Sequence, residues 1–231
     1  MDRVQIFEGA QRRLADASCA TTRSWRVSLH FNKGLARLIC FIRHTMDSFS
    51  YLSVILSIVL GLAMTQVLLG FRSLILTRAK VKLYTTTLIW AFIALIIPIQ
   101  AWWADFAMRK HANWTFLVLL VVMLQAISIY MTAALVLPDI SGEKFVDLRE
   151  HFFAHRSWFF GASFAGTVFS LSKTFALSGH LPSPADSAFE FTFGVVMIAA
   201  AMIRNEWFHR ILAPAAGLLY GIYIALLFAR L

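Results

Sequence analysis

From residue 50 onward the chain alternates long apolar runs with short polar segments. The first run, SYLSVILSIVLGLAMTQVLLG at residues 50–70, has no charged residue in 21 positions. That length suffices for a helix to cross a bilayer core about 30 Å thick. The pattern as a whole predicts an all-α fold class, a polytopic transmembrane helix bundle. Its six predicted spans lie at 50–70, 84–104, 114–137, 157–178, 187–203 and 211–228.

The composition supports a membrane protein, because 59% of the residues are hydrophobic and only 14% are charged. A formal net charge of +9 would suggest a nucleic-acid partner in a soluble protein. Here the basic residues lie between the apolar runs, where such residues anchor loops and contact anionic lipid headgroups. The lipid bilayer is therefore the expected partner, and nucleic acid is not.

Residues 1–45 differ from the transmembrane domain at residues 46–231, because they contain no apolar run. They hold eight of the 21 basic residues, namely Arg3, Arg12, Arg13, Arg23, Arg26, Lys33, Arg37 and Arg43. One interpretation is a basic arm, unstructured or partly folded as an amphipathic helix on the membrane surface. The alternative is that translation begins at Met46, directly before the first span.

The orientation prediction depends on this arm. The first, third and fifth loops carry nine basic residues, whereas the second and fourth loops and the C-terminal tail carry three. The positive-inside rule then places both termini outside. Counting the arm on the terminal side changes the balance to eleven against nine and nearly removes the preference.

Small residues recur every fourth position on three predicted helices, a pattern that lets helix backbones approach closely in membranes. The stripes are Ser53, Ser57, Gly61 and Thr65; Ala162, Gly166, Ser170 and Thr174; and Ala213, Gly217, Gly221 and Ala225. They predict packing within the bundle, with the helix at 50–70 at its centre. The alternative use of such stripes is contact with a second copy or another membrane protein.

Two charged side chains, Lys173 and Glu190, fall well inside the predicted spans. Each lies seven to nine residues from the 181–184 turn, so an antiparallel hairpin places them at similar depth and predicts an ion pair. Intramembrane charges are costly and often mark an ion or proton pathway. The alternatives are a structural salt bridge, or Lys173 extending its long side chain to the interface.

Polar uncharged side chains also occur within the first three spans. They are Gln66, Gln100, Gln125, Ser128 and Thr132. Such residues either line a polar cavity or form hydrogen bonds between helices, each contributing about 0.5 to 2 kcal/mol.

The densest polar cluster precedes the fourth span and consists of Arg149, Glu150, His151, His155 and Arg156. Two histidines four residues apart suit a metal ion, but one such pair is weak support, and Cys19 and Cys40 lack metal-binding spacing. The expected role is a charged collar at the cytoplasmic headgroups. No catalytic motif, metal or cofactor is predicted, and an enzyme is not expected.

Three stretches, SVILSIVLGLAMTQVLLGFRSLI, WWADF and DLREHFFAHRSWFFG, resemble those of a group of small six-helix bacterial inner-membrane proteins without an established activity. The resemblance covers the chain from about Met46 to its end. It implies a multi-pass protein of the bacterial cytoplasmic membrane and a start at Met46. It supplies no site residues.

Three functional hypotheses follow. The first is transport or sensing of a small solute or ion, involving Lys173 and Glu190. The second is a structural or accessory membrane subunit that acts through helix contacts. The third is a lipid-active membrane enzyme using the polar cluster at residues 149–156.

Overall fold

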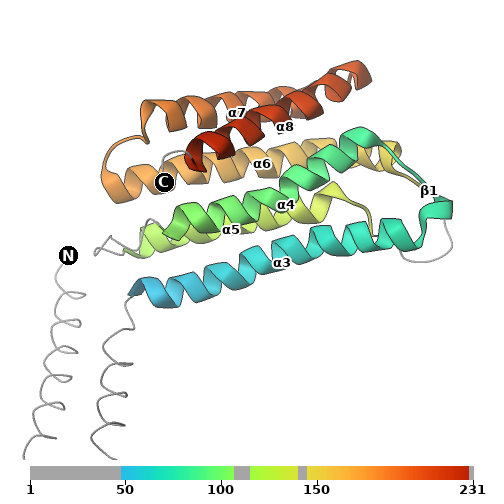
Figure 1. Cartoon of the computed structure of the whole chain (residues 1–231). Helices are drawn as coiled ribbons and strands as arrows, with labels where there is room; N and C mark the ends of the chain where they lie inside the picture. Colours follow the sequence, from blue (N-terminus) through green and yellow to red (C-terminus); the bar gives the residue numbers. More distant parts are fainter. Residues whose placement is uncertain (1–47, 107–114, 140–144, 229–231) are drawn as a thin grey trace, which may run out of the picture. The chain divides into compact units, whose positions relative to one another are not determined.

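The computed structural model describes residues 48–106, 115–139 and 145–228. In this part the chain forms α3 (Ser48–Leu76), α4 (Thr85–Phe106), α5 (Phe116–Val136), α6 (Leu148–Ser178), α7 (Pro184–Met202) and α8 (Glu206–Phe228) (Figure 1). A short 3-10 helix, η1 (Arg78–Lys80), and two strands, β1 (Val81–Lys82) and β2 (Val146–Asp147), complete it. The described residues from Tyr51 on form one compact unit. The predicted arm at 1–45 and Met46 lie outside the described residues.

The predicted all-α helix bundle is confirmed. Five helices, α3, α4, α5, α7 and α8, are each long and apolar enough to cross a membrane, which is compatible with a multi-pass integral membrane protein. The remaining predicted span, the fourth at 157–178, corresponds to α6, which is longer but more polar, with Lys173 and several serines and threonines along it. The structure therefore supports five or six spans.

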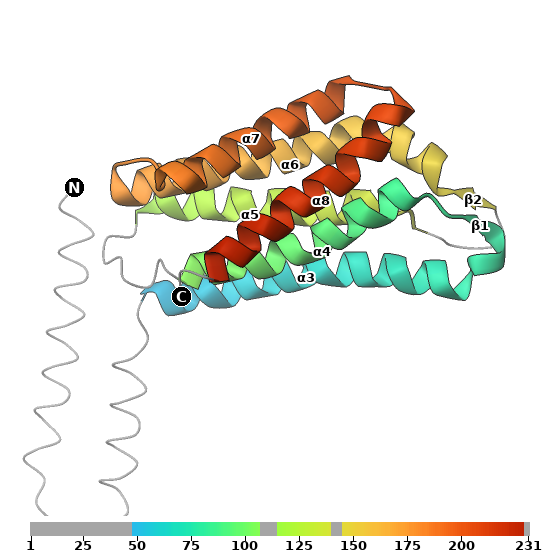
Figure 2. The same ribbon diagram turned by 45° about the horizontal axis from the view of Figure 1, so that its top comes forward.

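The most polar helix, α6, lies at the centre of the described bundle. Its backbone packs closely against α5 on one side and α7 on the other, and also touches α4. Figure 1 shows α6 between α5 and α7, and in Figure 2 α8 runs obliquely across α4. A helix surrounded by protein needs less apolar surface than one facing lipid, and this explains how α6 tolerates its polar residues.

The prediction that α3 is the central packing helix is wrong. Its buried positions are Leu52, Leu56, Leu60, Ala63, Val67 and Leu74, all apolar. Its predicted packing face, which includes Ser57 and Gly61, is exposed instead, and a Cβ added to Gly61 would meet nothing within 4 Å. A close approach of α3 lies near its other end, where a Cβ on Gly70 would lie 2.7 Å from Leu137 Cδ1.

The fourth helix starts earlier than predicted. The predicted span begins at residue 157, but the chain is continuously helical from Leu148. The Asp147 side chain caps this start by accepting a hydrogen bond from the Arg149 N–H. Leu148 and Phe152 are buried in the bundle and not directed to headgroups. Parallel pairing of β1 with β2, with Val81 opposite Val146, holds this end in place.

Candidate functional site

A cavity of about 350 Å³ lies among five of the helices. Its wall includes Gln100 of α4, Gln125 and Thr132 of α5, a row of hydroxyl residues and Lys173 on α6, Glu190 on α7, and Tyr220 on α8. The lining extends from Ser163 on α6 to Pro182 and Asp186 at the turn between α6 and α7. The cavity therefore runs along α6 toward one end of that helix.

Three of the predicted cavity residues, Gln100, Gln125 and Thr132, line this cavity. The other two are used in contacts between or within helices. Gln66 Nε2 donates to the Tyr130 hydroxyl at 3.2 Å, which joins α3 to α5. Ser128 donates to the Leu124 carbonyl at 2.9 Å.

Lys173 forms a buried ion pair with a residue that the sequence analysis missed. Its Nζ lies 2.6 Å from Asp105 Oδ1, and the two side chains are 8% and 9% exposed. The sequence predicts Glu190 as the partner, and the structure has Asp105 in that place. Asp105 is one residue beyond the predicted second span, but α4 continues through it to Phe106. The signal in the sequence that could have identified Asp105 was an acidic residue in the last turn of a membrane-spanning helix.

Glu190 lies on α7, six residues after the helix begins at Pro184, or about 9 Å along the helix axis. Its Oε1 accepts a hydrogen bond from Ser170 Oγ at 2.9 Å. Its Oε2 is enclosed and has no hydrogen-bond partner. A carboxylate with one unmatched oxygen, on the wall of a cavity, is a candidate ligand-binding group.

Aromatic side chains form the wall that α7 and α8 contribute, and the sequence analysis did not identify them. Phe189 and Tyr223 stack with their ring centroids 3.9 Å apart. Tyr220 donates from its hydroxyl to Gln100 Oε1 at 2.9 Å, which connects α8 to α4. The cavity thus has a hydroxyl-rich side formed by α6 and an aromatic side formed by α7 and α8.

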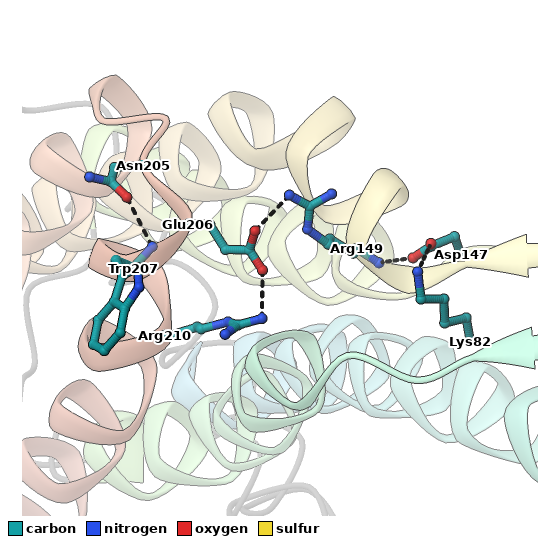
Figure 3. A network of polar contacts seen from close by, with 7 residues as sticks. All are labelled: Lys82, Asp147, Arg149, Asn205, Glu206, Trp207 and Arg210. Carbon is teal, nitrogen blue, oxygen red and sulfur yellow. Dashed lines mark hydrogen bonds and ion pairs between the residues drawn. The ribbon is translucent and has the colours of Figure 1, made fainter.

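A second polar group lies at the other end of α6, where that helix begins. Glu206 of α8 lies between Arg149, whose Nη2 is 2.6 Å from Oε2, and Arg210, whose Nη2 is 2.8 Å from Oε1 (Figure 3). Asp147 accepts from the Arg149 N–H at 2.8 Å and pairs with Lys82 Nζ at 3.1 Å. These bonds connect α6, α8 and β1. The hydrogen bonds from Arg149 and Lys82 hold the pKa of Asp147 below its ordinary value.

The predicted headgroup cluster does not form a single exposed surface. Arg149 forms the ion pair with Glu206, and Glu150 is exposed. Arg156, in contrast, is only 4% exposed and donates a hydrogen bond to the Ala201 carbonyl at 3.1 Å. Burial and the neighbouring His155 lower the pKa of His151. Arg156 is therefore part of the bundle interior, which corrects its assignment to the headgroups.

The two histidines of the cluster lie side by side, with ring centroids 4.5 Å apart and ring planes tilted by 31°. His151 Nε2 lies 3.3 Å from the Leu135 carbonyl, and His155 Nδ1 lies 3.1 Å from the His151 carbonyl. Among the described residues, no three His, Cys, Asp or Glu side chains are grouped so as to hold a metal ion.

The remaining predicted packing residues divide between interior and surface. A Cβ on Gly166 would lie 3.6 Å from Ser128 Cβ, and one on Gly217 would lie 3.7 Å from Ile89 Cγ2. Both glycines therefore lie at helix interfaces. Gly221 is exposed with nothing within 4 Å of such a Cβ. Ser53 is half-buried, and Ser57 Oγ accepts from Trp102 Nε1 at 3.1 Å.

Comparison with protein-family models, curated proteins and solved structures gives no match. The resemblance to bacterial inner-membrane proteins, the bacterial membrane and the placement of the termini outside stay predictions.

Proposed function

We propose that the protein admits a small polar solute into the cavity beside α6 and carries it across the membrane. The observation that carries this proposal is a cavity of about 350 Å³ whose wall includes Lys173 and Glu190. Ligand sites in helical membrane proteins lie between helices, and ionisable groups at such depth are expensive to keep without a purpose.

The two ends of α6 differ in a way that suits transport. The cavity reaches the α6–α7 turn, where Pro182 and Asp186 line it. At the opposite end of α6, the ion pair of Arg149 with Glu206 connects α6 to α8, and Arg210 of α8 holds the same carboxylate. Access from alternate sides requires one end to be held together while the other admits solute. This arrangement supports a state that is open toward the α6–α7 turn.

A cavity-filling substitution tests the proposal. Thr174 and Ser172 both donate their hydroxyls to carbonyls four residues earlier on α6, but Thr174 lines the cavity and Ser172 is exposed. Thr174→Phe should block solute entry, whereas Ser172→Phe adds the same ring on the outer face. Swelling of proteoliposomes is measured with urea, glycerol, guanidinium chloride and sodium acetate.

We expect faster entry of at least one of these solutes than into protein-free liposomes, and loss of that entry in Thr174→Phe alone. Equal rates with and without protein for every solute would overturn the proposal. Equal effects of the two phenylalanine variants would also overturn it, because the cavity would then not be the route.

One observation favours the accessory-subunit hypothesis as a second candidate. A Cβ added to the exposed Gly61 of α3 would meet nothing within 4 Å, and small residues on a lipid-facing surface suit contact with another helix. Crosslinking between cysteines introduced at Gly61 and at the buried Ala63 distinguishes the two faces. Crosslinks formed at residue 61 and not at 63 would support it.

A further inference from the structure

Four serine and threonine hydroxyls of α6 that line the cavity present oxygen lone pairs, because their protons are already used. Ser163, Thr167 and Thr174 each donate to the backbone carbonyl four residues earlier, at 2.9, 3.2 and 3.2 Å. Ser170 donates its proton to Glu190 at 2.9 Å. A serine or threonine hydroxyl has one proton and two acceptor lone pairs. These residues therefore offer acceptors to whatever enters the cavity.

The unmatched polar atoms on the cavity wall are acceptors as well. Glu190 Oε2 and Gln125 Oε1 are both enclosed and without a hydrogen-bond partner. A buried acceptor without a partner destabilises the protein, and a ligand that brings a donor or a positive charge removes this penalty. The carboxylate of Glu190 turns easily about its terminal bond, since that torsion has only broad minima.

The charges around the cavity are negative in balance. Among the described lining residues Lys173 is the one cationic side chain, and its ammonium group is paired with Asp105 at 2.6 Å. Glu190 is then a lining acidic group that has no ion pair with a described residue. At effective dielectric constants below that of water, such an excess attracts cations and opposes anions.

The aromatic side of the cavity also suits a cation. Phe189, Phe193, Tyr220 and Tyr223 line it, and the faces of such rings attract ammonium and guanidinium groups within about 6 Å. We infer that the cavity binds a small monovalent cation of the ammonium or guanidinium class, with Glu190 as its counter-ion. This inference rests on the proposed function and names the class of solute carried.

Solutes of similar size and shape but different charge test whether charge decides which solute enters. Guanidinium, urea and acetate are small planar species that differ mainly in charge, and sodium represents an inorganic cation. Uptake of each radiolabelled species is measured in potassium-loaded proteoliposomes with valinomycin, which balances the charge that a cation moves. We expect guanidinium uptake to exceed urea uptake, with acetate at the level of protein-free liposomes. Sodium uptake equal to or faster than guanidinium uptake would show that the solute is an inorganic cation. It would overturn the assignment to the ammonium or guanidinium class.

Glu190→Gln tests the counter-ion, because glutamine keeps an oxygen for Ser170 and removes the charge. We expect it to lower guanidinium uptake at least about tenfold, as loss of one partner of an enclosed charge pair does. Glu150→Gln, at an exposed position, should leave uptake unchanged. If Glu190→Gln unfolds, shown by its melting curve in detergent, Glu190→Asp serves as the second variant, which keeps the charge and should retain guanidinium preference.

The outcomes distinguish this inference from the proposed function. Uptake of urea without preference for guanidinium, or guanidinium uptake unchanged in Glu190→Gln, would overturn the cation class and leave the transport function standing. No uptake of any species above protein-free liposomes would overturn both.

Discussion

Lys173 on α6 and Asp105 on α4 lie 2.6 Å apart between Nζ and Oδ1, in a part of the bundle where both side chains are nearly inaccessible. Each charge is tolerable there because the other neutralises it. The pair also fixes the end of α4 beside the last turns of α6, where the cavity approaches the α6–α7 turn. Its contribution is measurable because removing one partner leaves an uncompensated charge.

Lys173→Met is expected to reduce the free energy of unfolding by about 3 to 5 kcal/mol, because Asp105 is left buried without a partner. The double variant Lys173→Met/Asp105→Leu should recover most of this loss, since no charge then remains enclosed. Denaturant unfolding in detergent micelles measures both. Lys80→Met, at an exposed lysine, is the control and should change stability by less than about 0.5 kcal/mol. A double variant no more stable than Lys173→Met would contradict the pairing.

Gly70→Ala is expected to destabilise the bundle, although alanine is the better helix former. The new Cβ would lie 2.7 Å from Leu137 Cδ1 and 2.8 Å from Leu137 Cβ, and such overpacking costs about 1 to 3 kcal/mol. Gly61→Ala on the same helix meets nothing within 4 Å, so it should gain up to about 1 kcal/mol from helix propensity. Melting temperatures of the two variants should move in opposite directions. A shift of the same sign and size in both would show that Gly70 is not at a close contact.

The positions of the helices could be predicted from the sequence because each apolar run is long and contains at most one charged residue. The start of α6 could not, since residues 148–156 are polar and their helix depends on the Asp147 cap and on the burial of Leu148 and Phe152. The face of α3 that packs against the bundle could not be predicted from the sequence either. Its leucine face and its small-residue face are both suitable for packing, and only the neighbouring helices decide between them.

The candidate site could be predicted in part. Gln100, Gln125 and Thr132 were identified because amides and hydroxyls inside apolar runs are conspicuous, and they line the cavity. The partner of Lys173 was not found, because Asp105 enters the bundle only when α4 continues past its apolar run. Aromatic lining residues such as Tyr223 carry no signal of their own in a chain with so many apolar positions.

Tyr220→Phe is expected to weaken the contact between α8 and α4. The tyrosine hydroxyl donates to Gln100 Oε1 at 2.9 Å, and hydrogen bonds between membrane helices contribute about 0.6 to 1.7 kcal/mol. The free energy of unfolding in detergent should fall by a similar amount. Tyr51→Phe, at a tyrosine that is 61% exposed, should leave it unchanged. Equal stabilities of wild type and Tyr220→Phe would mean that this bond adds nothing.

Asp147 should make stability depend on pH in the acid range. The Arg149 N–H and Lys82 hold its pKa in the folded state below its ordinary value of 3.8. A carboxyl whose folded pKa is depressed stabilises the fold fully above its unfolded pKa, and this stabilisation is lost as the pH falls through the folded pKa. Asp147→Asn keeps a helix-capping side chain but has no proton to lose.

The melting temperature of Asp147→Asn should therefore lie below that of the wild type at about pH 6, and the gap should close as the pH falls below about 3.8. Melting curves of both proteins in detergent, recorded across this range, measure the gap. Asp139→Asn, which changes an exposed carboxylate in the loop after α5, is the control for general acid effects. A gap that stays constant with pH would indicate that the charge of Asp147 does not stabilise the start of α6, and that only its capping oxygen does.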